Sequence, residues 1–250
     1  MSDFVTQTMV SGVQVICLNR ADKKNAITLA MYQTLTALLS SAEQDDAIKA
    51  TMIYGLGGEF SSGNDINEFI HIAQKPEKLD VILSFLKALS TYTKPLIAGV
   101  EGRAVGVGAT LLLHCDLVLA SREARLQFPF VQLGLVPEAA SSFLLPRLLG
   151  HPKAFEVLVL CDVIGAEQAH QMGLINHLCE AGEAYSVALD YAIKVAALPT
   201  EAVALSKKLL KSSIQDEVQN TLLREGRLFK ARLSSNEAAY AFSSFLSRQK

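Results

Sequence analysis

A glycine-rich turn at residues 102–108 is the first candidate for chemistry in this sequence of 250 residues. It joins an apolar run at 96–100 to a second apolar segment at 107–113. The first run is typical of a strand buried on both faces, and the second, which is apolar on nearly every side, is typical of a buried helix. The first turn of a helix has N–H groups without intrahelical partners, and glycines before it let another group approach them. The turn is therefore a candidate oxyanion site, although a tight core would also favour glycines here.

Two nucleotide motifs do not fit this turn. A dinucleotide fingerprint that began at Gly106 would need a third glycine at the position of Leu111, and a P-loop would need Gly-Lys-Ser or Gly-Lys-Thr. The turn thus suits a small oxyanion better than a pyrophosphate. A second loop, GLGGEFSSGND at 55–65, follows another apolar run and can also present backbone N–H groups.

Glu138 is the candidate general base. It follows Pro137, and its neighbours are apolar: Leu133, Leu135, Val136, Ala139 and Ala140. Burial among them would raise its pKa toward neutrality, as a general base requires. The alternative is a structural role, because the dipole of a following helix also favours an acidic residue there. Asp65 and Glu68 are weaker candidates, since they follow a glycine loop and can simply stabilise the start of a helix.

Other kinds of catalytic site find little support. The five histidines lack the H-E-x-x-H spacing of a zinc site, so no metal is expected. His114 lies in an apolar segment, where a core histidine with a local hydrogen bond is the expected role. No G-x-S-x-G motif occurs, because Phe60 stands where its first glycine should be, and Ser61 and Ser62 are expected to be loop residues.

The remaining patterns predict the elements that position these residues. Strands alternate with helices over the first 150 residues, which predicts an α/β domain. The expected strands are 4–10, 13–18, 48–55, 96–100, 116–120 and 125–130, and the expected helices are 29–41, capped by Thr28, 65–72 and 77–92. Pro137 and Glu138 are expected to open a helix that Pro146 closes. Beyond Lys153 the pattern is almost wholly helical, with a brief strand at 174–178 and helices at 184–198, 201–212, 216–232 and 236–247.

Composition limits the class of protein. Half of the residues are hydrophobic, and the net charge of −2 with a pI near 6.2 gives no reason to expect nucleic acid or an anionic membrane as a partner. No apolar stretch approaches the roughly 20 residues of a membrane span. The start of the sequence does not resemble a targeting signal, the final RQK is not a peroxisomal address, and the four cysteines are far apart. A cytoplasmic protein with reduced, buried thiols is therefore expected.

Four of these segments together resemble the crotonase, or enoyl-CoA hydratase/isomerase, superfamily. They occur in the family's order and cover nearly the whole chain: LNRADKKNAIT, EFSSGNDINEF, KPLIAGVEGRAVGVGATLLLHCDLVLAS and LGLVPEAASSFLLPRLLG. The resemblance implies an α/β fold, a crotonase-like spiral of ββα units at 1–198, followed by a C-terminal helical trimerisation region at 199–250. It also implies an acyl-CoA thioester as substrate and a homo-oligomer, either a trimer or a dimer of trimers, with no cofactor of its own.

The same resemblance implies roles for individual residues. The backbone N–H groups of Asn64 and Val107 would form the oxyanion hole that holds the thioester oxygen. Coenzyme A would lie against a group of residues from two loops: Lys24, Ala26, Ser62, Gly63, Asp65 and Ile66.

Departures from the hydratase pattern imply which reaction is catalysed. Hydratases of the family carry glutamates at the positions of Thr110 and Phe130, so this chain lacks both. It instead resembles the Δ3,Δ2-enoyl-CoA isomerase branch, whose single glutamate matches Glu138, and Phe130 would form an apolar wall. The implied function is the conversion of 3-enoyl-CoA to 2-enoyl-CoA in fatty acid β-oxidation. A hydratase or another acyl-CoA enzyme of the superfamily, and a non-catalytic acyl-CoA-binding or assembly protein, remain as alternatives.

Overall fold

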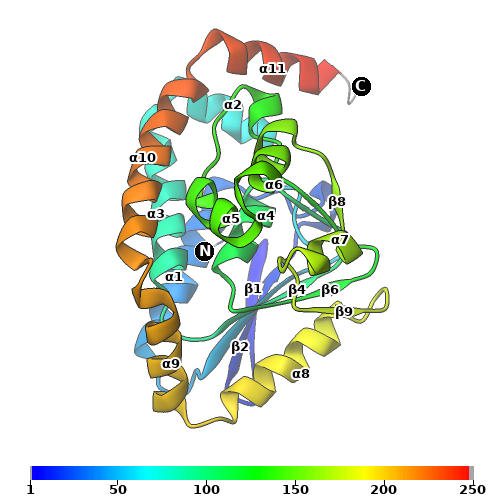
Figure 1. The fold of residues 1–250 in the computed structure, drawn as a ribbon, viewed down its shortest axis with the longest axis vertical. Coiled ribbons are helices and arrows are strands. Elements are labelled where there is room, and N and C mark those ends of the chain that lie inside the picture. Colours follow the sequence, from blue (N-terminus) through cyan, green and yellow to red (C-terminus); the bar gives the residue numbers. More distant parts are fainter. Residues whose placement is uncertain (1, 248–250) are drawn as a thin grey trace.

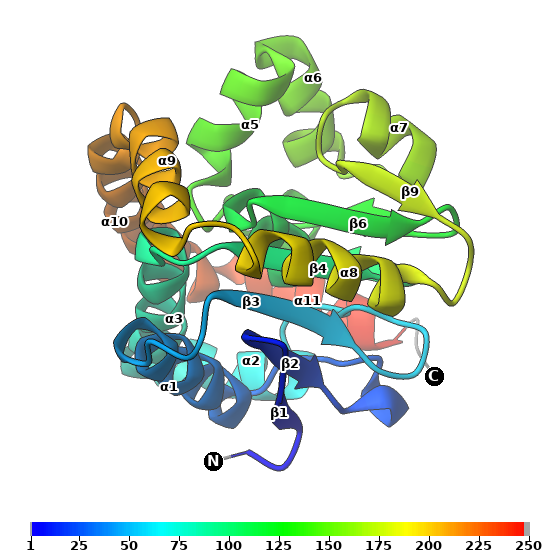
Figure 2. The same ribbon diagram turned by 90° about the horizontal axis from the view of Figure 1, so that it is seen from below.

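Two β-sheets form the framework of the protein in a computed structural model, which describes residues 2–247 (Figures 1 and 2). The final RQK, for which no peroxisomal role is expected, lies outside the described residues. The large sheet has the strand order β1 (Val5–Val10), β2 (Val13–Leu18), β3 (Ala50–Gly55), β4 (Leu96–Val100), β6 (Leu117–Ser121) and β9 (His177–Cys179). The small sheet has the order β5 (Arg103–Val105), β7 (Arg125–Gln127) and β8 (Ile164–Gly165).

The predicted N-terminal hairpin is confirmed. β1 pairs with β2 in the antiparallel direction, and Val10 lies opposite Val13 across the turn. Ser11 and Gly12 form this turn, both with positive φ. From β2 to β9 every neighbouring pair in the large sheet is parallel, so each strand needs a crossover segment on one face of the sheet.

Helices pack on both faces of the large sheet, and others lie away from it against other helices or the small sheet (Figure 1). They are α1 (Leu29–Gln44), α2 (Ile66–Gln74), α3 (Leu79–Thr91), α4 (Val107–Thr110), α5 (Ser141–Leu149), α6 (His151–Phe155), α7 (Ala166–Gln171), α8 (Ala184–Ala196), α9 (Thr200–Ser212), α10 (Gln215–Leu233) and α11 (Asn236–Ser247). Short 3-10 turns occur at Ala21–Lys23, Pro76–Lys78, Leu111–His114 and Val131–Leu133, and a π-helical turn at Glu156–Leu160. None of the helices in the described part of the chain combines the length and apolar character of a membrane span.

The chain passes from the large sheet to the small one and then into helices, three times in succession. In the first pass β3 leads to Ser61, which forms an isolated bridge with Ala104 of the small sheet, and then to α2 and α3. In the second pass β4 leads to β5 and α4. In the third pass β6 leads to β7 and α5. This repeated path agrees with the predicted spiral of ββα units. The ends of the strands therefore bring the loops at 55–65 and 102–108 to one place.

The core has two parts, one on each face of the large sheet. α8 lies across the outer face, where Gly99 of β4 is needed because a Cβ there would meet the Ala184 carbonyl oxygen at 2.9 Å. The main core lies on the other face and contains the buried sides of α1 and α3. The Thr28 hydroxyl accepts a hydrogen bond from the Met31 N–H, as expected for the cap of α1.

The C-terminal helices begin after Pro199, as predicted. α10 packs beside α3 and α5 (Figure 1), and α11 packs against the turn at Val131–Leu133. The Phe69 ring of α2 lies 5.9 Å from that of Phe229 on α10 and 6.0 Å from that of Phe242 on α11, measured between ring centroids. These helices thus enclose one side of the core, and their role in trimerisation remains a prediction.

Some predicted boundaries are wrong. The helix expected from Pro137 to Pro146 begins at Ser141 and continues through Pro146 to Leu149. A proline removes one helical hydrogen bond and usually ends or kinks a helix, but here Gly150 ends it. The strands β5 and β8 were not predicted, because two or three residues are too few to show an alternating pattern.

Candidate active site

Backbone hydrogen bonds join the two predicted N–H-presenting loops. The Ser61 N–H donates to the Arg103 carbonyl at 2.9 Å, and the Val105 N–H donates to the Ser61 carbonyl at 2.9 Å. The segment after β3 is therefore paired with the segment after β4. This pairing brings Asn64 and Val107 to the same region of the molecule.

Two glycines allow this close approach. Gly63 has φ +87°, and a Cβ there would lie 2.6 Å from the Val105 carbonyl oxygen. A Cβ on Gly108 would lie 2.9 Å from the Ser61 Cβ. Among the described residues, no acceptor bonds the N–H groups of Asn64 or Val107. Both N–H groups remain available as oxyanion donors, and this role stays a prediction.

Tyr32 fixes the side chain of Asn64. The fully buried Tyr32 hydroxyl, on α1, donates to Asn64 Oδ1 at 2.6 Å. Burial raises the pKa of Tyr32 well above its usual range, and the nearby charge of Glu138 raises it further, so this hydroxyl stays a neutral donor. Sequence reasoning missed Tyr32, because it reads as one more apolar position of an amphipathic helix.

Glu138 lies in a turn ahead of α5 and not in the helix itself. Ala139 and Ala140 both have φ 57°, a left-handed conformation that costs a residue with a Cβ about 1–2 kcal/mol. Such strain is frequent at functional sites, where the surrounding structure must impose it. The prediction that Glu138 begins a helix is thus wrong, which removes the structural explanation for an acidic residue here.

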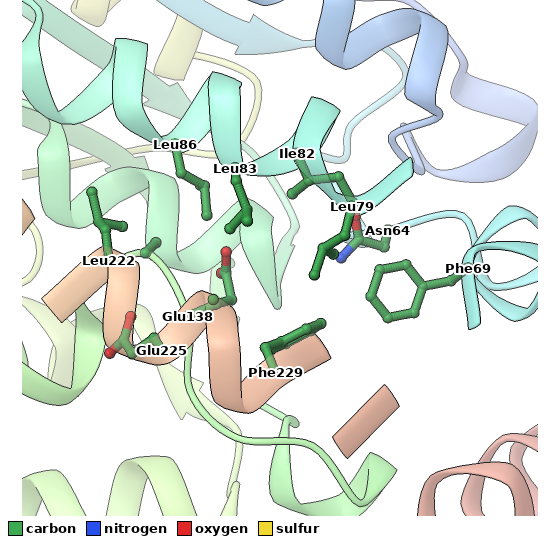
Figure 3. Close-up of a pocket in the computed structure, with 12 residues that line it drawn as sticks. Asn64, Phe69, Leu79, Ile82, Leu83, Leu86, Glu138, Leu222, Glu225 and Phe229 are labelled. Atoms are coloured by element: carbon green, nitrogen blue, oxygen red, sulfur yellow. The ribbon is translucent and has the colours of Figure 1, made fainter. Parts of the chain in front are cut away.

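The Glu138 side chain enters an apolar pocket between α3 and α10 (Figure 3). Only 7% of the residue is exposed. The pocket is lined by Asn64, Phe69, Leu79, Ile82, Leu83, Leu86, Glu138, Ala139, Leu222, Glu225, Gly226 and Phe229. Burial raises the Glu138 pKa to about 8, a hydrogen bond from Thr110 opposes this rise, and the charge of Glu225 adds to it. A carboxylate with this pKa can accept a proton near neutral pH.

By the family resemblance, Thr110 stands at one of the two positions where hydratases carry a glutamate. Its buried hydroxyl donates a short hydrogen bond to Glu138 Oε1. Phe130 occupies the other position and is buried, but it is not among the residues that line the pocket. The apolar wall expected at Phe130 therefore stays a prediction, and the apolar lining of this pocket comes from leucines of α3 and α10 and from Phe229.

Side chains from distant elements hold the Glu138 turn. His114 Nε2 lies 2.8 Å from the Ala139 carbonyl oxygen, and the Ser141 hydroxyl donates to the Glu138 carbonyl at 2.6 Å. Burial lowers the pKa of His114 to about 4, so the ring is neutral, and Nε2 must carry the proton because the carbonyl only accepts. The predicted core histidine is confirmed, but the expected local hydrogen bond is wrong, because its partner Ala139 lies 25 residues away in the Glu138 turn.

The residues predicted to bind coenzyme A lie on two paired segments. The Ser62 N–H donates to the Lys24 carbonyl at 2.9 Å, and the Ile27 N–H donates to the Gly63 carbonyl at 2.7 Å. Lys24 is exposed, whereas Ala26 is buried. Asn25, which sequence reasoning missed, is fully buried and donates to the carbonyls of Leu56 at 2.8 Å and Glu59 at 2.7 Å. It ties this segment to the glycine loop.

Asp65 and Glu68 have structural roles, as expected. Asp65 caps α2, which starts at Ile66, by accepting from the N–H groups of Asn67 and Glu68, and it pairs with Arg20 at 2.7 Å. Although burial opposes it, the hydrogen bond from Arg20 and those from the cap lower the pKa of Asp65. Glu68 accepts from the Leu29 N–H at 2.7 Å.

Metal-binding clusters are absent from the part of the chain that the structure describes, where no three His, Cys, Asp or Glu side chains gather as ligands.

Comparison with known proteins gives one family. Residues 8–250 match the family described as enoyl-CoA hydratase/isomerase. The chain is 33% identical to enoyl-CoA delta isomerase 2 of Rattus norvegicus over 247 residues, which cover 97% of this chain and 63% of that protein. The human protein of that name is likewise covered over only 63% of its length.

The family match extends to a relative that is named a hydratase and to a solved structure. An enoyl-CoA hydratase of Alternaria alternata is 33% identical over 246 residues, covering 96% of this chain and 82% of that one. The structure of OdaA from Pseudomonas aeruginosa has a TM-score of 0.94 at 42% identity and covers 98% of this chain and 99% of that chain. The fold and the family are therefore common to relatives with isomerase and hydratase names.

Proposed function

This chain belongs to the enoyl-CoA hydratase/isomerase family, and we propose that it is a Δ3,Δ2-enoyl-CoA isomerase with Glu138 as its base. The observation that carries the proposal is the environment of Glu138. It is a buried carboxylate in an apolar pocket, with its pKa raised to about 8, while Thr110 stands where a hydratase has a glutamate. A single base suffices for a proton shift between two carbons, whereas hydration also needs a group that activates water.

The reaction proceeds in two proton transfers. The Glu138 carboxylate removes a proton from C2 of a 3-enoyl-CoA, and the electron pair of the broken C–H bond moves toward the thioester carbonyl to give a dienolate. The N–H groups of Asn64 and Val107 donate to its oxygen, and each such donor contributes about 3 kcal/mol to the barrier reduction. The protonated Glu138 then returns the proton to C4, and the double bond lies between C2 and C3.

Two further features support an acyl-CoA substrate and its place of binding. The segments 24–27 and 62–66 are paired, and the second contains Asn64. Coenzyme A bound along these segments would direct its thioester to the N–H groups of Asn64 and Val107. The residues expected to contact it are Lys24, Ala26, Ser62, Gly63, Asp65 and Ile66. The leucines of α3 and α10 give the acyl chain an apolar surface. The substrate is thus expected to be a fatty acyl thioester of β-oxidation.

Exposed apolar side chains support a homo-oligomer, either a trimer or a dimer of trimers. Leu209 and Leu210 of α9 are 76% and 80% exposed, and Leu223 of α10 is 68% exposed. Large apolar patches on a protein surface commonly mark interfaces. A monomeric mass in sedimentation would contradict this inference.

Separate assays with 3-enoyl-CoA and 2-enoyl-CoA test the proposed reaction. We expect the wild-type protein to isomerise the first and to hydrate the second only weakly. Glu138→Gln should lower kcat about 10²–10⁴-fold, because amide and carboxylate have the same shape but only the carboxylate takes a proton. Affinity for acyl-CoA, measured by calorimetry, should be retained.

The matched control is Glu217→Gln, which changes an exposed glutamate of α10. It should behave as wild type in both assays. Efficient hydration of 2-enoyl-CoA by the wild-type protein would favour the hydratase alternative, which the Alternaria relative supports. If the wild-type protein and Glu138→Gln both bind acyl-CoA and neither turns it over, the non-catalytic alternative is favoured.

A further inference from the structure

A second buried carboxylate, Glu225 of α10, lies beside Glu138. It is 5% exposed and lines the same pocket, although the reaction above assigns it no step. Its partners all come from the Glu138 turn. Oε2 accepts from the Ala140 N–H at 2.6 Å, and Oε1 accepts from the Ser142 N–H at 3.0 Å and from the Ser142 hydroxyl at 2.5 Å.

This turn requires support from outside. Ala139 and Ala140 are both left-handed, and Ala140, at the N-cap position of α5, has no side-chain group that caps the helix. The N–H groups of Ala140 and Ser142 at the start of the helix have no intrahelical partners. Glu225 supplies the missing acceptors from a helix that lies 85 residues later in the chain.

We propose that Glu225 is a positioning residue that fixes the turn from Glu138 to Ser142 and thereby directs the Glu138 carboxylate into the pocket. Glu138 is two residues before Ala140, so a rotation of these peptide units would turn its side chain away from the substrate. This inference rests on the proposed function of Glu138. It adds a contribution of α10 through backbone geometry, beside the charge by which Glu225 raises the pKa of Glu138.

The geometry disfavours a role for Glu225 as a second base. Both of its oxygens accept hydrogen bonds from the turn, and although burial raises the Glu225 pKa to about 7, these donors oppose that rise. In Figure 3 the oxygens of Glu138 point toward Leu83 of α3, whereas those of Glu225 point away from the Glu138 carboxylate. The two carboxylates therefore face different partners.

The test compares Glu225→Gln and Glu225→Ala with the control Glu217→Gln, an exposed position on the same helix. Kinetics with 3-enoyl-CoA give kcat and KM, and hydrogen–deuterium exchange follows the amides of Ala140 and Ser142. We expect kcat to fall about 10-fold for Glu225→Gln, which keeps one acceptor oxygen, and about 100-fold for Glu225→Ala, with KM nearly unchanged. Exchange of the two amides should accelerate about 10-fold or more in both variants and not in the control.

Each other outcome has a definite meaning. An unchanged kcat in Glu225→Gln and Glu225→Ala overturns the proposal, and so does a loss of kcat without faster exchange, which would indicate a chemical role. If Glu225→Ala does not fold, the kcat and amide exchange of Glu225→Gln alone decide whether Glu225 is a positioning residue. If the wild-type protein does not isomerise 3-enoyl-CoA, the proposed function fails, and amide exchange together with a crystal structure of Glu225→Gln decides this inference. An unmoved Glu138 side chain in that structure would then overturn it.

Discussion

The two halves of the candidate site are built in different ways. The N–H-presenting loops, 61–64 and 104–108, are held by backbone hydrogen bonds, and glycines permit their close approach. The Glu138 turn is held by side chains of Thr110, His114 and Glu225, which lie 28, 25 and 85 residues from their partners in the turn. The backbone half is therefore visible in a local sequence pattern, whereas the side-chain contacts that hold the Glu138 turn are not.

The halves also differ in their response to pH. Backbone N–H groups do not titrate, so the N–H-presenting loops offer the same donors at every ordinary pH. The Glu138 carboxylate titrates, and burial sets its pKa. Geometric changes in the loops should consequently alter the size of the rate, whereas a change to a group that sets the Glu138 pKa should also alter the pH dependence of the rate.

Gly63→Ala disturbs the backbone half of the site and should have the largest effect of the changes that compare the two halves. The new Cβ would lie 2.6 Å from the Val105 carbonyl oxygen in a backbone with φ +87°, so the loop that carries Asn64 must move. We expect kcat/KM for 3-enoyl-CoA to fall about 100-fold or more, the usual effect of losing an oxyanion donor. The pH of half-maximal rate should stay where it is.

Gly182→Ala is the matched control for this variant. Gly182 has φ +86°, so alanine meets the same backbone strain, but its Cβ would meet nothing within 4 Å. The free energy of unfolding of this control should decrease, whereas its kcat/KM for 3-enoyl-CoA should stay at the wild-type value. Equal loss of activity in both variants would show that backbone strain, and not the approach of the two loops, is responsible.

Thr110→Val should lower kcat/KM by less than Gly63→Ala does, and it should act through the Glu138 pKa. It removes the hydrogen bond that lowers the pKa of Glu138 and nearly preserves the shape of a fully buried side chain. The Glu138 pKa should rise further above 8, so the base is ionised in fewer molecules near pH 7. We expect kcat/KM at that pH to fall about 10-fold, since a hydrogen bond to a charged group contributes roughly one pKa unit or more.

A full pH profile of kcat/KM separates this effect from simple misplacement. The profile of Thr110→Val should move to higher pH and recover much of the lost rate there. Thr34→Val, which changes a buried threonine of α1 that bonds the Ala30 carbonyl, should leave the profile in place. A uniform loss of rate at all pH values would show that Thr110 orients Glu138 and does not tune its pKa.

The contrast between the two halves also explains what the sequence could predict. Alternating apolar runs gave the order of strands and helices, and the glycines at 63, 106 and 108 indicated the N–H-presenting loops before any fold was known. Glu138 was found from its apolar neighbours. The boundaries of α5 and the roles of Tyr32, Asn25 and Glu225 were not found, because each depends on contacts between elements that are distant in the chain.

Stability as a function of pH gives the smallest expected effect and isolates Glu138. Its pKa rises from 4.5 to about 8 on folding, so between these values the unfolded chain has lost the proton that the native protein keeps. The native state then binds more protons, and the free energy of unfolding must decrease as pH increases through this window. The glutamine side chain of the Glu138→Gln variant cannot ionise, so the variant lacks this decrease.

Urea unfolding at pH 5 and pH 8 should therefore show the variant gaining stability over wild type by roughly 1–3 kcal/mol at the higher pH. His114, whose pKa is lowered, is present in both proteins, so its opposite contribution cancels in the difference. A constant difference between the two proteins across the window would mean that Glu138 is as well solvated when folded as when unfolded, and the buried-base mechanism would lose its support.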